Sequence, residues 1–353
     1  MLNYFISFIA AITALWLNLG QSLANPAPKQ QAILYFYNWS DYISPEVLTQ
    51  FTQETGIKVV ESTYESNETL YAKLKTYPSG SYDLIVPSTY FVSKMRQEGM
   101  LQKINHCQLK NFNHLDPLLL NKPFDPQNEY SIPYLWGFTG IGINRDEMDP
   151  QQIHSWADLW SPQYYNRLLV IDDARELFHI ALRRLGHPAN STDPQQIKAA
   201  YQTLRQLLPN ILLFNSDSPA TPFIAGEVNL GMLWSGAAYK ARQAGIPLQL
   251  LWPTEGAILW MDSLAIPVGA QHPDNALKLI DFILRPDIAA KIAQHIGYAT
   301  PNKTAKALLP EAVREDASLY PDANHLQQGD WQIDVGEAQK LYESYFQQLK
   351  TGY

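Results

Sequence analysis

The chain has 353 residues, of which 46% are hydrophobic and 17% are charged, and its formal net charge is -8. This length exceeds the size at which one core keeps growing, so two lobes are expected, and the composition excludes a disordered chain. A negative charge without any cluster of Lys and Arg gives no electrostatic footprint for nucleic acid or anionic lipid, and it favours cationic partners.

The N-terminus carries the pattern of a signal peptide. Residues 4–19 form a run without charge, and the following Ser22-Leu23-Ala24 offers small residues at the two positions that a signal peptidase reads. Residues 1–24 are therefore predicted to be a signal peptide cleaved near Ala24, followed by a linker at 25–30. An uncleaved membrane anchor is the alternative, but the run is shorter than the ~20 residues of a spanning helix. We expect an exported protein whose mature form is not inserted in a membrane.

Several kinds of site are excluded by what the chain lacks. Cys107 is the only cysteine, which rules out an intramolecular disulfide, and the 8 histidines are dispersed, so no metal site is expected. Gly140-Ile141-Gly142 is followed by Arg145 where a dinucleotide loop needs its third glycine. Ser235 is preceded by Leu233 where a nucleophile elbow needs a glycine. We therefore expect no cofactor.

After the linker, segments typical of strands alternate with segments typical of helices. The first predicted helix has Ser44 as its cap, Pro45 at its first position and Gly56 after its end. Strand–helix–strand units form parallel sheets with helices on their faces. The predicted elements of the first half are a strand at 33–37, this helix, a strand at 57–63, a helix at 68–76 and a strand at 82–86.

A second α/β half begins after the segment 140–144. One of its helices is expected to open near Asp173. From about Asp274 onward the pattern is mostly helical, and one helix starts at Pro286 and is ended by Gly297. The predicted strands of this half lie at 168–171, 228–234 and 248–252.

Aromatic and acidic residues follow the ends of the predicted strands. Segments 38–42 and 87–90 lie after the first and third strands, and Trp260-Met261-Asp262 pairs an indole with a carboxylate. Ligands of such sheets bind beyond the carboxyl ends of the strands. An aromatic face attracts an ammonium group and a carboxylate neutralises it, so the pattern predicts an amine site. The alternative is that these rings are core residues, because Trp and Tyr are frequently buried.

Asp173 and Glu176 stand at the head of a predicted helix and allow two interpretations. Their spacing fits a capping box, in which both acids accept hydrogen bonds from orphan backbone N–H groups. The same spacing fits a pair of ligand-binding carboxylates. The two interpretations are partly compatible, since one acid can cap the helix while the other faces a ligand.

Six motifs, found in the same order, resemble those of the periplasmic spermidine/putrescine-binding proteins. They cover nearly the whole mature chain, and several motifs in register are a specific signal. The motifs are residues 34–39, 62–69, 86–90, 172–176, 260–263 and 297–298.

The resemblance implies an α/β fold of two lobes, each a mixed, mostly parallel sheet flanked by helices, with the ligand in the cleft between them. Lobe 1 is expected at 31–142 plus 261–304, and lobe 2 at 143–260 plus 305–353. The implied function is that of a periplasmic solute-binding protein, not an enzyme. It would capture spermidine, putrescine or both and deliver them to the membrane permease of an ABC transporter.

The resemblance also carries over a set of ligand-binding residues. From the chemistry of the residues, we assign one terminal ammonium to Asp173 or Glu176 and a secondary or opposite amine to Asp262. Two positions depart from the family pattern, because Ser235 stands where Asn is expected and Leu259 where an aromatic residue is usual. The full set is Trp39, Tyr42, Ser88, Tyr90, Asp173, Glu176, Trp234, Trp260, Asp262, Tyr298 and Gln332.

Two other classes of function stay open from the residues alone. An exported carbohydrate-active enzyme also combines aromatic platforms with a carboxylate pair, but it needs two carboxyl groups that flank the scissile bond. A structural or receptor-docking protein would bind no small ligand. Saturable binding of amines without turnover separates the predicted function from both.

Overall fold

The computed structural model describes residues 32–76 and 80–351. The predicted signal peptide, its cleavage near Ala24 and the linker at 25–30 lie outside these residues. In the described part of the chain, the strands form a three-stranded sheet and a seven-stranded sheet, and helices flank both. We call the elements packed on the first sheet lobe 1 and those packed on the second sheet lobe 2. The predicted two-lobed α/β class is confirmed.

Lobe 1 is built on parallel strands in the order β2–β1–β3. Parallel neighbours need a crossover connection, and helices α2 and α3 supply the two that this sheet requires. The predicted order of the first half is confirmed, with element ends shifted by one or two residues. The elements are β1 (Ile33–Trp39), α2 (Pro45–Thr55), β2 (Lys58–Tyr64), α3 (Asn67–Thr76) and β3 (Leu84–Ile85).

The ends of α2 follow from the residues around them. Pro45 begins the helix, where its missing N–H leaves no hydrogen bond unmade. Ser44 is the N-cap residue, although its side chain accepts no capping hydrogen bond. Gly56 adopts a φ of 71° and donates its N–H to the carbonyl of Thr52. This left-handed conformation favours glycine, which has no Cβ to clash, so the helix ends there.

Lobe 2 is built on a mixed sheet in the order β10–β9–β4–β7–β5–β6, with β8 also paired to β4. The pairs β5–β6, β5–β7 and β9–β10 are parallel, whereas β4 runs antiparallel to β7, β8 and β9. This sheet is mixed as expected, but it is less parallel than expected because one long strand opposes three neighbours. The strands are β4 (Ile132–Asn144), β5 (Leu168–Val170), β6 (Ile211–Phe214), β7 (Leu230–Trp234), β8 (Leu248–Leu251), β9 (Ile258–Leu264) and β10 (Asp330–Trp331).

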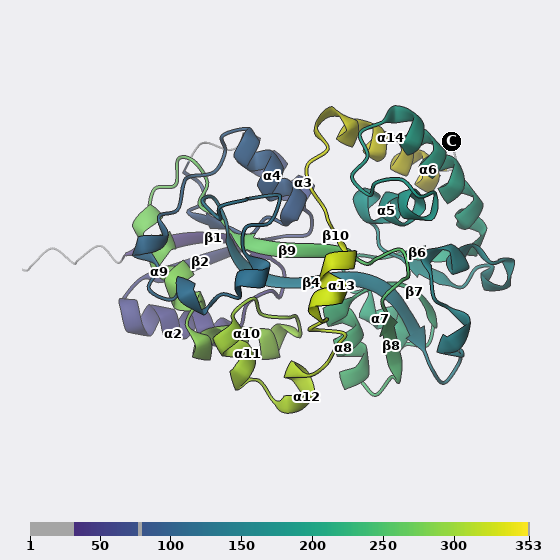
Figure 1. The fold of residues 1–353 in the computed structure, drawn as a ribbon. Helices are drawn as coiled ribbons and strands as arrows, with labels where there is room; N and C mark the ends of the chain where they lie inside the picture. Colours follow the sequence, from purple (N-terminus) through teal and green to yellow (C-terminus); the bar gives the residue numbers. More distant parts are fainter. Residues whose placement is uncertain (1–31, 77–79, 352–353) are drawn as a thin grey trace, which may run out of the picture. The chain divides into compact units, whose positions relative to one another are not determined.

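Two long strands, β4 and β9, pass from one lobe into the other (Figure 1). Ile132 at the start of β4 lies in a lobe 1 core, and Ile141 near its end lies in the lobe 2 core. The antiparallel partner β9 does the reverse, with Ile258 in the lobe 2 core and Leu264 in the lobe 1 core. The segment expected to cross between the halves, 260–263, lies within β9.

Helices lie on both sides of each sheet (Figure 1). In lobe 1, α3 and α4 lie on one side and α2, α9 and α10 on the other; in lobe 2, α5, α6 and α14 lie on one side and α7 and α8 on the other. The helix predicted from Pro286 to Gly297 is confirmed as α10. The remaining helices are α4 (Thr89–Gln97), α5 (Ala174–Arg184), α6 (Pro194–Leu207), α7 (Ala220–Ile224), α8 (Ser235–Gln243), α9 (Pro273–Ile283), α10 (Pro286–Ile296), α11 (Lys303–Leu308), α12 (Glu311–Arg314), α13 (Ala323–Gln328) and α14 (Gln339–Thr351).

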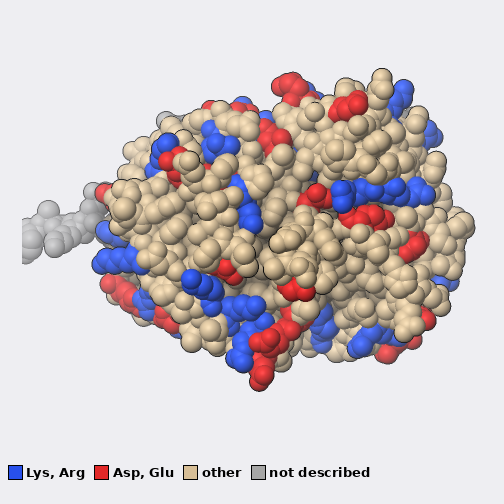
Figure 2. All heavy atoms as spheres, in the orientation of Figure 1, with Lys and Arg blue, Asp and Glu red and all other residues tan. Residues whose placement is uncertain are grey.

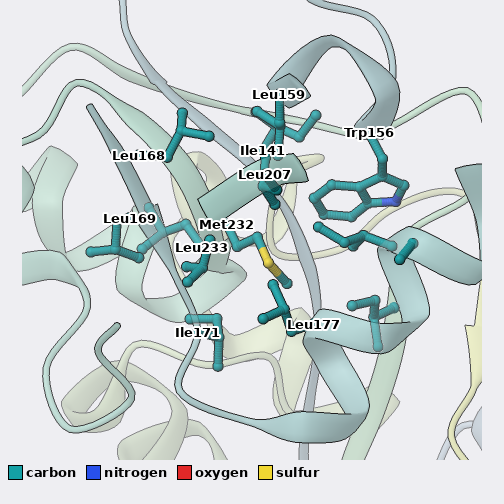
Figure 3. Close-up of a cluster of buried hydrophobic side chains, with 14 of the residues drawn as sticks. Ile141, Trp156, Leu159, Leu168, Leu169, Ile171, Leu177, Leu207, Met232 and Leu233 are labelled. Carbon is teal, nitrogen blue, oxygen red and sulfur yellow. The ribbon is translucent and has the colours of Figure 1, made fainter. Parts of the chain in front are cut away.

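The largest apolar cluster fills the interior of lobe 2. Figure 3 shows Met232 and Leu233 of β7 among side chains from β4, β5, α5 and α6. Trp156, which is fully buried, closes one end of the cluster, and its indole N–H donates to the carbonyl of Gly256 at 2.9 Å. A buried polar group without a partner is costly, and this hydrogen bond lets the chain place its bulkiest ring in the core.

The lobe boundaries given above stay predictions. Ala305 and Leu309 pack against Ala289, Ala290 and Ala293 of α10, which belongs to lobe 1. The C-terminal helix α14 packs instead in the lobe 2 core. This packing favours a third crossing that lies later in the chain than residue 304.

The surface carries no area of one charge sign on the face that Figure 2 shows, where Lys and Arg are interspersed with Asp and Glu. None of the helices formed by residues 32–76 and 80–351 is long and apolar enough to cross a membrane.

We expect Gly56→Ala to lower the free energy of unfolding by about 1 kcal/mol. The Cβ of alanine makes the left-handed conformation unfavourable, whereas glycine adopts it freely. No heavy atom lies within 4 Å of the position of the added methyl group, so the loss would be purely conformational. Urea unfolding with an unchanged m-value measures the effect. Gly56→Asn is the control, since asparagine tolerates this conformation and should lose less. Equal stability of the alanine variant and the parent would contradict this account of the helix end.

Candidate ligand-binding site

Asp262, on β9, accepts hydrogen bonds from two hydroxyl groups of lobe 1. Tyr42 donates to Oδ2 at 2.5 Å and Ser88 donates to Oδ1 at 2.5 Å. Both donors lie just after lobe 1 strands, β1 and β3, which is the strand-end placement that the sequence predicts. Burial raises the pKa of Asp262 to about 6, and the two hydrogen bonds partly oppose that shift. No basic group is among the causes of the shift, so this carboxylate has no cation beside it in the described part of the chain.

Three aromatic rings lie around this carboxylate. Tyr298 packs edge-on against Trp260, with ring centroids 5.2 Å apart, and against Tyr42, with centroids 6.0 Å apart. Burial, and then the negative charges of Asp262 and Glu176, raise the pKa of Tyr298 far above its usual range. Tyr298 therefore lies between two acids that belong to separate elements, β9 and α5.

Two glycines make room for these rings. A methyl group at Gly236, in the first turn of α8, would overlap the ring of Tyr298. A methyl group at Gly137, on β4, would overlap the ring of Trp260 and the hydroxyl of Ser235. Real Cβ atoms do not approach other atoms this closely, so both positions exclude every other residue unless the rings move.

Asp173 and Glu176 divide the two roles that their spacing allows. Asp173 is the N-cap residue of α5, and its Oδ1 accepts the backbone N–H of Glu176 at 2.9 Å. Glu176 does not return a hydrogen bond to the cap. Its Oε1 accepts the indole N–H of Trp234 at 3.0 Å instead, and its Oε2 has no hydrogen-bond partner among the described residues. One acid thus caps the helix while the other presents a free oxygen.

The electrostatics of this acid pair oppose its ionisation. Burial, followed by the charge of Asp173, raises the pKa of Glu176 to about 8, and the neutral side chains of Trp234 and Thr139 oppose the shift. Burial also raises the pKa of Asp173, where the backbone N–H groups of the helix start and the nearby Arg175 oppose it. Two carboxylates this close together disfavour each other's ionisation, and a cationic ligand relieves that repulsion.

A third acid, Glu68, joins the pair from lobe 1. It lies in the first turn of α3, and its side chain is exposed as a whole. Its carboxyl group is nonetheless crowded, and burial and the charge of Asp173 raise the pKa of Glu68 to about 7. Tyr90, on α4, lies between these acids, since its hydroxyl is 3.5 Å from Oδ2 of Asp173 and its own pKa is raised by burial and by both charges.

The remaining two predicted residues, Trp39 and Gln332, form no hydrogen bond and no ring contact with the other predicted site residues in the described part of the chain. The indole N–H of Trp39 donates to the carbonyl of Val86 at 2.9 Å, and its ring packs on Tyr64. Gln332 follows β10, is 4% exposed, and its Nε2 has no partner among the described residues.

The structure brings most of the predicted site residues into direct contact. Tyr42, Ser88 and Asp262 form one hydrogen-bonded group; Tyr90 meets Asp173, Trp234 meets Glu176, and Trp260 meets Tyr298. The sequence analysis did not include Glu68 in the site, although Glu68 lies in the motif 62–69. An acid in the first turn of a helix ordinarily stabilises the helix dipole, and this explains its presence without a ligand. Gly137 and Gly236 carried no signal, since only the packed rings reveal why they are needed.

A metal centre has no basis in residues 32–76 and 80–351, where no group of three or more His, Cys, Asp or Glu side chains is arranged to hold an ion. The chemistry that the site offers is carboxylates for cationic groups and aromatic faces for apolar or cationic ones.

Comparison with known proteins identifies the family. Residues 46–321 match the family described as bacterial extracellular solute-binding protein. The chain is 60% identical to the spermidine/putrescine-binding periplasmic protein of Salmonella typhimurium, over 95% of this chain and 96% of that protein. It is 59% identical to the protein of the same name from Escherichia coli K12, with the same coverage.

A solved structure shares the fold. It is that of the spermidine/putrescine ABC transporter substrate-binding protein PotD from Streptococcus pneumoniae, which is 38% identical, with a TM-score of 0.79 over 91% of this chain and 99% of that one. The chain belongs to the bacterial extracellular solute-binding proteins, in the group of the spermidine/putrescine-binding periplasmic proteins.

Proposed function

We propose that this protein captures polyamines, namely spermidine, putrescine or both. The observation that carries the proposal is a pair of buried carboxyl groups, Asp262 on β9 and Glu176 on α5. Tyr298 is close enough to both that their charges raise its pKa. Neither carboxylate has a basic group among the causes of its raised pKa. A ligand with two cationic groups joined by an apolar chain can place one cation beside each carboxylate. It then offsets the free-energy cost of burying both negative charges.

The rings fit the apolar part of such a ligand. Polyamines carry ammonium groups separated by methylenes, and methylenes lose unfavourable contact with water when they pack on aromatic faces. Such faces are supplied by Trp234, Trp260 and Tyr298, which lie beside the two buried carboxylates. A ring beside an ammonium adds roughly 0.5 to 2 kcal/mol of cation–π attraction.

The assignment to individual residues is part of the proposal. One terminal ammonium binds Glu176 and Asp173, with Glu68 and Tyr90 beside them, and another amine binds Asp262, with Tyr42 and Ser88 as its hydroxyl partners. Trp39, Trp234, Trp260, Tyr298 and Gln332 complete the wall. The relatives reported above support the ligand class, because the names of the two that are 60% and 59% identical specify spermidine and putrescine.

The biological setting follows from the same relatives. We propose that the chain is exported to the periplasm after cleavage of a signal peptide near Ala24, and that it hands its ligand to the membrane permease of an ABC transporter without catalysing a reaction. The related binding proteins are named as periplasmic, which supports the compartment. The alternative of a carbohydrate-active enzyme finds no support in the family or in these relatives.

Calorimetric titration of the mature protein tests the ligand class. Spermidine and putrescine should bind with one site per chain and raise the melting temperature, as any ligand of the native state must. Lysine and maltose serve as comparisons, since lysine carries a carboxylate beside one of its two ammonium groups and maltose has no charge. Binding of maltose together with no response to any linear amine at millimolar concentration would overturn the proposal.

Replacement of Asp262 by asparagine should separate binding from stability. Removing one partner of a buried charge pair costs about 3 to 5 kcal/mol, so Asp262→Asn should weaken spermidine binding by a hundredfold or more. The melting temperature of the ligand-free protein should not fall near pH 7.5, because a buried carboxylate with a raised pKa destabilises the fold when it is ionised.

The matched control for this variant is Glu311→Gln, an exposed acid in α12 that should leave binding unchanged. Wild-type affinity in Asp262→Asn, or a large fall in melting temperature with binding intact, would show that Asp262 is a structural residue.

The raised pKa values also predict opposite pH trends with and without ligand. Asp262 holds its proton more tightly in the folded chain, with a pKa of about 6, than in the unfolded chain, where it is about 4. The ligand-free melting temperature should therefore fall as pH rises through that window, and Glu176 should extend the fall to higher pH. Affinity for spermidine should instead increase from pH 5 to pH 8, because amines with pKa values near ~10 stay charged while the acids ionise.

Titrations at pH 5, 6, 7 and 8 in buffers of different ionisation enthalpy measure both the affinity and the protons released. Glu176→Gln should reduce the proton release at the upper end of this range. An affinity that is flat across these four pH values would contradict the assignment of ammonium groups to these carboxylates.

A further inference from the structure

Arg175 is a buried cation that the site described above leaves without a role. It lies in the first turn of α5, between Asp173 and Glu176 in sequence, and it is 2% exposed. A buried charge ordinarily pairs with an opposite charge. Arg175 forms no ion pair within the described residues: its Nη2 donates to Asn190 at 2.8 Å and its Nη1 donates to the carbonyl of Ile333 at 3.1 Å.

The guanidinium group lies close to two tyrosine rings instead. Its Cζ is 5.2 Å from the ring centroid of Tyr342, on α14 of lobe 2, and 5.3 Å from that of Tyr90, on α4 of lobe 1. Both rings are at least 95% buried. The planar guanidinium can stack on an aromatic face in a way that a compact ammonium cannot, so this geometry is specific to arginine. One of its two ring contacts therefore joins the lobes.

The lobe 2 end of this arrangement is held firmly. Asn190, which accepts from Arg175, also accepts the N–H of Ile333 at 3.1 Å and donates to the carbonyl of Trp331 at 3.0 Å. These two residues flank Gln332. The hydroxyl of Tyr342 donates to the carbonyl of Ser191 at 2.6 Å, which fixes the second ring. Of the contacts that the guanidinium group makes with residues 32–76 and 80–351, the one to Tyr90 alone reaches lobe 1.

We propose that Arg175 is an interlobe latch: its guanidinium group, anchored to lobe 2, lies over the ring of Tyr90 of lobe 1 and favours the closed form of the protein before any ligand is bound. Because the guanidinium group forms no ion pair with Glu176, the unpartnered Oε2 of that carboxylate stays open to a ligand. The latch adds to the affinity without touching the ligand, since ligand can leave only after the lobes separate. Arg175 is then a positioning residue, and only this affinity effect rests on the proposed function.

The single cysteine allows a direct measurement of closure. Cys107 is exposed in the short helix His106–Gln108 of lobe 1, and Tyr165, which is 70% exposed, follows the short helix Pro162–Tyr164 of lobe 2. Spin labels on Cys107 and on Tyr165→Cys report the distance between the lobes by pulsed electron resonance. In the ligand-free parent, the distribution should contain a closed population that matches the spermidine-bound one.

Arg175→Lys keeps the charge beside Asp173 and removes the flat group that stacks. Without ligand, it should shift the distances toward an open population. Spermidine binding should weaken by roughly 2- to 30-fold, carried mainly by faster dissociation, which is the size of one cation–π contact. Gln339→Ala, which removes a long 3.5 Å hydrogen bond to Arg175 and a 3.0 Å hydrogen bond to Glu343, both within lobe 2, is the matched control and should keep the closed population.

A second pair of variants tests the contact from lobe 1 and needs no ligand. Tyr90→Leu removes the ring and should open the ligand-free protein as Arg175→Lys does. Tyr90→Phe keeps the ring, loses the hydroxyl next to Asp173, and should retain the closed population. If Arg175→Lys and Tyr90→Leu both leave the ligand-free distances unchanged, Arg175 only anchors lobe 2 and the latch is wrong. A parent that binds no spermidine would overturn the proposed function and leave this distance experiment intact.

Discussion

The placement of carboxyl groups in a water-poor interior between two lobes is the constraint on which the rest of the structure depends. Taking a charge out of water costs several kcal/mol even after the surroundings relax. Asp262 and Glu176 are 7% exposed, and burial is the largest cause of the raised pKa of each. The fold therefore stores an unfavourable electrostatic state, and in the proposed function a polycation relieves it.

The fold limits that cost with partial charges rather than with cations. The start of α5 directs backbone N–H groups at Asp173, and the hydroxyls of Tyr42 and Ser88 donate to Asp262. Hydrogen bonds from neutral donors stabilise a carboxylate but leave its net charge in place. A lysine at the same distance would neutralise the charge and compete with the ligand. The one buried arginine nearby, Arg175, is turned toward tyrosine rings, which is consistent with the same requirement.

The sequence predicts more of the local structure than of the long-range structure. The helix between Pro45 and Gly56 is predictable because proline and glycine act within a few residues of the helix ends that they define. The long strands β4 and β9 were not predicted as strands, because both are buried along their length and show no alternation of polar and apolar residues. Their antiparallel pairing, which makes the second sheet mixed, depends on contacts between residues more than a hundred positions apart.

The same distinction applies to the site. Asp262, Tyr42 and Ser88 were predicted together because each follows a strand or carries a motif, and the hydrogen bonds among them agree. The division of labour between Asp173 and Glu176 was not decided by their spacing, since only the position of Trp234 shows where the second carboxylate is directed. Glu68 and Gly236 derive their importance from groups on other elements, Asp173 and Tyr298, so no local pattern marks them.

If the proposed ligand binds both Asp262 and Glu176, ligand binding and lobe closure form a single equilibrium. Asp262 takes its hydrogen bonds from lobe 1, whereas Glu176 belongs to a helix of lobe 2. Tyr298 senses both charges only because the two elements are close together. A ligand that binds both carboxylates gains its full interaction free energy only when the lobes are closed. It can shift the open–closed equilibrium by no more than the difference between its binding free energies for the closed and open forms. A contact within the chain that also favours closure, such as the one between Arg175 and Tyr90, reduces the part of the binding free energy that is needed to bring the lobes together.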